Sequence, residues 1–245
     1  MKTWILGARI LRELVFTSKG LAWLPMFSLL LSALVTLFLT NVDLSLMDQR
    51  TMMFMTTQAI VLLGTLAVVA VGADAVAGER ERGTLEALLA APVARHQLLG
   101  GYLAGALAPW AAMVLIGLPY LAVVSASTSG FLSAAAYLLL AGSVLALGVG
   151  AWTISLSAGA GSLRNGTLKV LMAYACLAIP AVLSSALREH WVGRVYNFVD
   201  PFSNVMNILN SAIIDEQGFS LQMLIAFTVV GLWYARRCIV TMAPA

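Results

Sequence analysis

Six long apolar runs constrain this chain more than any other feature of its sequence. They cover about residues 21–40, 51–73, 98–125, 131–155, 168–187 and 219–235. A helix of about 20 apolar residues crosses the hydrocarbon core of a bilayer. Only 10% of the residues are charged, against about 25% in soluble domains. We therefore predict an all-α integral membrane protein in which residues 20–245 form a domain of six transmembrane helices.

Positive charge is unevenly divided between the two sides that six spans define. Of the 14 Lys and Arg residues, only Arg50, Arg188 and Arg194 fall on one side. Because Lys and Arg concentrate in cytosolic loops, we expect both termini in the cytosol and a multi-pass protein of the inner (cytoplasmic) membrane. This topology accounts for the formal net charge of +3 without a nucleic-acid partner.

Two further helical elements are predicted outside the spans. Residues 1–19 place basic side chains on one side of a helical wheel and apolar side chains on most of the rest, which is typical of an amphipathic helix in the membrane interface. Residues 188–220 form the long outer connection. In it, Asp200 followed by Pro201 predicts the N-cap and first residue of a short outer-face helix.

A compact charged segment joins the second and third apolar runs, at about residues 79–92. Thr84 can cap a helix over residues 84–91, and Pro92 ends that helix. Leu85, Leu88 and Leu89 form one apolar stripe on it. At 1.5 Å per residue the helix is ~12 Å long, too short to span but suited to fill a groove on a partner. The competing interpretation, a solvated loop, would leave the leucine stripe in water.

This segment closely resembles the connection between the second and third spans of ATP-binding-cassette (ABC) transporter permeases of the type-2 exporter class. In this sequence the pattern is carried by Glu79, Glu81, Gly83, Thr84, Leu85, Glu86, Leu88, Leu89, Pro92 and Gly100. Gly101 stands where the family pattern has a lysine. The six spans, cytosolic termini, N-terminal amphipathic helix and outer helix extend the resemblance across the chain.

The resemblance implies a half-transporter. Two permease subunits, as a homodimer, would dock on two copies of a separate ABC ATPase subunit, which would bind ATP and magnesium. The chain itself has no GxxxxGK[ST] pattern, so it cannot bind ATP by that route. We expect no catalytic residue, metal or cofactor on it. Accessory proteins and the lipid bilayer complete the expected partners. The coupling residues would be Glu79, Glu81, Arg82, Gly83, Thr84, Leu85, Glu86, Leu88, Leu89 and Pro92.

The resemblance also points to the second and fifth spans as walls of a transport cavity. The candidates to face it are Met55, Gln58, Met172 and Tyr174. The cargo stays open among lipids, drugs, polysaccharides, peptides and haem, the last as in haem-export-type permeases of cytochrome maturation. A secondary transporter would need midplane charges and paired broken helices. An intramembrane enzyme would need polar groups at membrane depth, and His96 and His190 fall on opposite sides.

Overall fold

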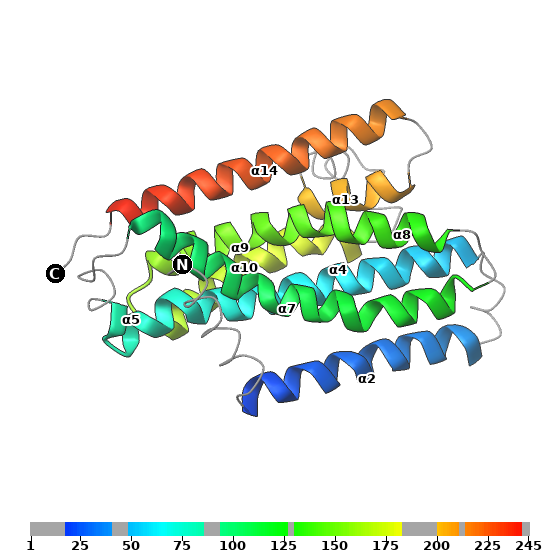
Figure 1. Cartoon of the computed structure of the whole chain (residues 1–245), viewed down its shortest axis with the longest axis horizontal. Coiled ribbons are helices and arrows are strands. Elements are labelled where there is room, and N and C mark those ends of the chain that lie inside the picture. The colour runs from blue at the N-terminus through cyan, green and yellow to red at the C-terminus, as the bar shows by residue number, and fades with distance from the viewer. Residues whose placement is uncertain are drawn as a thin grey trace.

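The structure is a computed structural model that describes residues 18–40, 49–85, 94–126, 130–182, 200–210 and 214–241. All regular elements in these ranges are helical, which confirms the all-α prediction for them. The long helices are α2 (Ser18–Thr40), α4 (Gln49–Ala73), α7 (Arg95–Val124), α9 (Ser143–Ala158), α10 (Leu163–Val182) and α14 (Ile214–Thr241). They lie side by side in one bundle, with α2 and α14 on opposite flanks (Figure 1).

Four helical stretches among the described residues are long and apolar enough to cross a membrane. They are Thr51–Glu81, Arg95–Val124, Phe131–Ala158 and Gly218–Thr241. α2 contains a shorter apolar stretch, and α10 packs against α4 and α9. The chain is therefore a multi-pass membrane protein. The count of six spans, with α2 and α10 as the other two, remains a prediction.

Small residues allow close contacts in the centre of the bundle. Trp110 of α7 is buried between Gly64 of α4 and Gly142, where a Cβ on either glycine would lie within 2.9 Å of the indole ring. The indole nitrogen donates a hydrogen bond to Ser143 Oγ at 3.1 Å. Packing of small against large residues is how helices associate in lipid, where the hydrophobic effect does not drive them together.

The contact between α9 and α14 also packs large side chains against glycines. Trp152 packs on Gly231, and its indole nitrogen donates to the carbonyl of Phe227 at 3.3 Å. Its ring also stacks on Tyr234, with a centroid separation of 5.7 Å. Gly148 of α9 in turn faces Phe227 and Thr228. These small residues are therefore used within the subunit, as are the buried Gly101 and Gly105 of α7.

Two membrane helices contain a wider, π-helical turn that the sequence did not predict. η1 (Asp74–Gly78) continues α4 into the short α5 (Glu79–Glu81). η2 (Leu138–Gly142) joins α8 (Phe131–Tyr137) to α9. The second predicted span therefore does not stop at residue 73 but remains helical to Glu81. Such insertions in helices are frequent at functional sites.

The short helix predicted after Asp200 is present as α13 (Pro201–Asn210). Asp200 caps it, because its Oδ2 accepts hydrogen bonds from the Ser203 amide at 2.9 Å and the Ser203 hydroxyl at 2.7 Å. Phe202 and Val205 are fully buried, and α13 packs on α14 and α10. The N-terminal amphipathic helix and the earlier part of the outer connection lie outside the described residues.

Candidate functional site

The charged segment lies at one end of the bundle. α5 is at this end together with the beginning of α7 and the end of α14, whereas α13 is at the opposite end (Figure 1). We call the end that holds α5 the polar end. The first half of the predicted coupling segment, up to Leu85, is described there.

Asp74 and Arg82 form an ion pair along this stretch of helix. One guanidinium nitrogen of Arg82 donates to both carboxylate oxygens of Asp74 at 3.1 Å. Gly78 lies between them, and a Cβ there would come within 2.4 Å of an Asp74 oxygen. Both side chains are about half exposed, so the pair contributes only about 0–1 kcal/mol. Asp74, near the end of the second predicted span, therefore has an arginine partner.

Three consecutive side chains of α5 each bond to a different part of the bundle. Glu79 accepts a short hydrogen bond from the Tyr102 hydroxyl of α7. Arg80 donates to the carbonyl of Ala160 in the α9–α10 connection at 2.7 Å. Glu81 accepts from the amide of Leu163, the first residue of α10, at 2.9 Å. We call these three contacts the α5 clamp.

The α5 clamp adds contacts that the sequence did not predict. Glu79 and Glu81 are predicted coupling residues, and together with Arg80 they are bonded inside the subunit, while their role toward a partner stays a prediction. Sequence reasoning also missed Tyr102, Ala160 and Leu163. Two of these contribute only backbone groups, which no side-chain pattern marks. The third contact, between Glu81 and the N-terminus of α10, is favourable because that helix end carries partial positive charge.

Gly83 ends α5 and redirects the chain. It is the only described residue with a positive φ, at 72°, and its amide donates to the carbonyl of Arg80 at 3.1 Å. A left-handed glycine after the last helical residues is a common helix stop. Thr84 then donates its hydroxyl to the carbonyl of Glu79 at 3.1 Å, and Leu85 is buried.

The rest of the predicted coupling helix is not described. Glu86, Leu88, Leu89 and Pro92 lie outside the described residues. The capping role of Thr84 and the leucine stripe therefore stay predictions. The structure describes the first two residues of this helix, Thr84 and Leu85, which Gly83 connects to the α5 clamp. We call these two residues the stem of the coupling segment.

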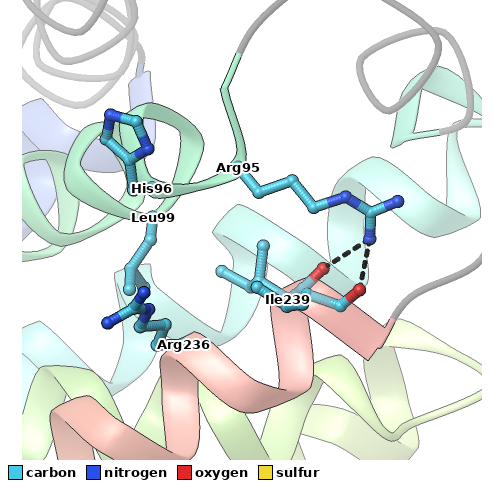
Figure 2. A pocket seen from close by; sticks show the side chains of 6 residues that line it. Arg95, His96, Leu99, Arg236 and Ile239 are labelled. Carbon is cyan, nitrogen blue, oxygen red and sulfur yellow. Dashed lines mark hydrogen bonds between the residues drawn. The ribbon is translucent and has the colours of Figure 1, made fainter.

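A second connection at the polar end joins α7 to α14. Arg95, the first residue of α7, donates from one guanidinium nitrogen to the carbonyls of Ile239 at 3.0 Å and Val240 at 2.6 Å (Figure 2). The last carbonyls of a helix carry partial negative charge and lack partners within the helix, so a cation there is favourable. The beginning of α7 is thus tied to the end of α14 at this site.

The cavity candidates do not share one environment. Met55 and Met172 are exposed, at 37% and 69%, and Gln58 is half-buried on α4. Tyr174 instead turns into the bundle, where its hydroxyl donates to the carbonyl of Leu62 at 2.6 Å. Its role in a cavity, like that of the other three, stays a prediction.

The fold and this site define a multi-pass membrane protein with a structured polar end. The family model described as ABC-2 family transporter protein matches residues 31–241, which is most of the chain. The chain therefore belongs to the ABC-2 transporter family and is a transmembrane ABC permease. Such a permease is not itself catalytic, and its family implies an ABC ATPase subunit as partner. A search of curated proteins returned no match.

Proposed function

We propose that this chain is the permease subunit of an ATP-driven exporter of the inner membrane. Two copies pair as a homodimer, and each docks on one copy of a separate ATPase subunit that binds ATP and magnesium. The polar end and both termini face the cytosol. The observation that carries this proposal is the α5 clamp, which connects the stem of the coupling segment to separate helices.

The α5 clamp gives a route for force. Residues 84–91 leave α5 at Gly83, so a push on them by the ATPase subunit acts first on α5. Glu79 passes the displacement to α7, while Arg80 and Glu81 pass it to the beginning of α10. Hydrogen bonds to charged groups contribute about 1.5–3 kcal/mol each, so the three contacts favour joint movement of the helix ends. Joint movement is what a change between inward- and outward-facing states requires.

We place the cargo path between the two permease copies. α10 presents large apolar side chains outward, among them Leu168, Met172 and Ile179 with half or more of their surface exposed. In an assembled pair, this face would line the path together with Met55 of α4, whereas Tyr174 would support the wall from inside. An apolar lining favours an amphipathic or lipid-like cargo, and haem fits the same description.

Two substitutions in the coupling helix test the proposal. Glu86→Arg reverses the charge beside the leucine stripe, and Leu88→Asp puts a charge in it. We expect either variant to insert normally but to lose most co-purification of the ATPase subunit from the same genome, and most ATP hydrolysis by the reconstituted complex. Glu216→Arg makes the same charge reversal near the beginning of α14, at the opposite end of the bundle, and should leave both unchanged.

The outcome separates coupling from folding. Membrane insertion and monodispersity in detergent are measured for all three variants. Full ATPase association and hydrolysis with both Glu86→Arg and Leu88→Asp would overturn the proposal.

A further inference from the structure

A small hollow at the polar end lies outside the α5 clamp, between the beginning of α7 and the end of α14. Its volume is about 130 Å³, room for about four water molecules at ~30 Å³ each, which suits a tetrahedral phosphate group. The residues that line it are Arg95, His96, Leu99, Arg236, Ile239 and Val240 (Figure 2). Three of the six are basic types and none is acidic.

The three basic side chains that line the hollow differ in their contacts. Arg95 is turned toward the end of α14, where it binds the carbonyls of Ile239 and Val240. The partial negative charge of that helix end is therefore already compensated. Arg236 and His96 are exposed, and among the described residues no hydrogen bond or ion pair involves either side chain. A positive group at the hollow with no counter-charge among the described residues favours an anion there.

The backbone adds to this positive potential. α7 begins at Arg95, and the residue before it, Ala94, has no side chain that could cap the helix. The first turn of a helix carries partial positive charge from amides that lack partners within the helix. The first residues of α7 and Arg236 of α14 thus line the same hollow from two different elements.

The surroundings suit an amphipathic anion. α7 and α14 are both candidate membrane spans, so their ends at the hollow lie near headgroup level. α14 exposes Val229, Val230, Trp233 and Tyr234 along its length before Arg236. Trp and Tyr are enriched at membrane interfaces. A lipid chain can therefore lie along α14 while its headgroup reaches the hollow.

We propose that this hollow binds the phosphate of an anionic phospholipid, with Arg236 as the main contact and His96 and the α7 N-terminus as further donors. Basic pockets between membrane helices are a known mode of headgroup recognition. The site is distinct from the ATPase-coupling segment, and it does not depend on which leaflet the polar end faces. Its occupancy would fasten α14 to α7 in addition to Arg95.

The test uses the full chain in nanodiscs that contain equal amounts of phosphatidylglycerol and phosphatidylcholine. Native mass spectrometry after release counts the lipids that stay bound. We expect retention of phosphatidylglycerol over phosphatidylcholine, and a drop of about five-fold in that preference for Arg236→Gln, which corresponds to ~1 kcal/mol. Arg236→Lys keeps the charge and should retain most of the preference.

Arg237→Gln is the matched control. It removes the same charge one residue away, but Arg237 lies over the Trp233 ring at 5.5 Å and does not line the hollow. It should keep the preference of the unaltered chain. An unchanged preference in Arg236→Gln, or an equal loss in Arg237→Gln, would overturn the proposal. Arg236-dependent stabilisation by millimolar inorganic phosphate, without any lipid preference, would instead assign the site to free phosphate and overturn the lipid assignment.

Discussion

The two ends of the bundle are held together by different chemistry. At the polar end, charged side chains bridge separate elements, as Arg80 does to Ala160 and Arg95 does to Ile239. At the opposite end, the bridge from α7 to α2 is neutral: the Tyr120 hydroxyl lies 2.8 Å from Ser28 Oγ and 2.7 Å from Ser32 Oγ.

In these examples, the contacts between elements that involve a charged side chain lie at the polar end. A hydrogen bond to a charged group contributes about 1.5–3 kcal/mol, against about 0.5–1.5 kcal/mol for a neutral one. The polar end is therefore the more firmly connected end. Such a connection fits the proposed coupling, in which the polar end would move as one unit when the ATPase subunit pushes it.

The largest effect is expected from a test of which end faces the cytosol. Single cysteines at Ser162 and Asn210, in a background without Cys176 and Cys238, should react with an impermeant reagent from opposite sides of the membrane. Asn210 should be labelled from outside in intact cells. Lys and Arg favour the cytosolic side of a membrane, and they place the polar end, opposite Asn210, on that side. Labelling of Ser162 from outside would reverse the orientation and with it the functional meaning of the comparison.

Glu81→Lys should give the next largest effect. It removes the acceptor for the Leu163 amide and places a cation at the positive end of α10. The combined cost is about 2–4 kcal/mol, measured as lower thermal stability in detergent, together with loss of ATP hydrolysis by the reconstituted complex. Glu216→Lys makes the same change at the beginning of α14 and should cost less than 1 kcal/mol. Equal effects would mean that the α5 clamp is not a special connection.

Tyr102→Phe and Tyr120→Phe form a matched pair across the two ends. The first removes the donor to Glu79, which leaves a carboxylate without its hydroxyl partner. The second removes the neutral contacts with Ser28 and Ser32. We expect a loss of about 1.5–3 kcal/mol and reduced ATP hydrolysis for Tyr102→Phe, but only about 0.5–1.5 kcal/mol and normal hydrolysis for Tyr120→Phe. The reverse order would refute the comparison.

Gly83→Ala should have the smallest effect that can still be resolved. The added Cβ meets no atom within 4 Å, so only the left-handed φ of 72° opposes it. The cost is about 1 kcal/mol, read as a lower midpoint of thermal unfolding. Gly161→Ala is the control, because its Cβ is equally unobstructed and its φ is not positive. If both variants unfold at the same temperature, strain at Gly83 is not important.

Local features were predictable from the sequence, and contacts between distant elements were not. The apolar runs predicted the long helices, and the Asp200–Pro201 pair predicted α13, because a helix cap depends on neighbouring residues. The α5 clamp joins Arg80 to Ala160, 80 positions apart, through a backbone carbonyl that every residue possesses. No pattern of residue types could reveal it.

The same limit applies to the charges of α5 and to the wide turns. The sequence shows how many charges α5 carries, but not the direction in which each side chain points. Direction depends on η1, and a single π-helical turn leaves almost no trace in hydrophobic periodicity. The sequence also does not show the side-chain directions of the cavity candidates: Tyr174 turns inward to Leu62, whereas Met172 is exposed.

The wide turn η1 also determines in which direction around the helix axis the side chains of α5 point. A π turn carries about one residue more than an α turn, and one residue corresponds to a rotation of ~100°. Shortening the stretch from Asp74 to Gly78 by one residue would turn Glu79, Arg80 and Glu81 away from their present partners without changing any of their side chains. The length of this stretch, more than its composition, therefore determines which charge meets which helix.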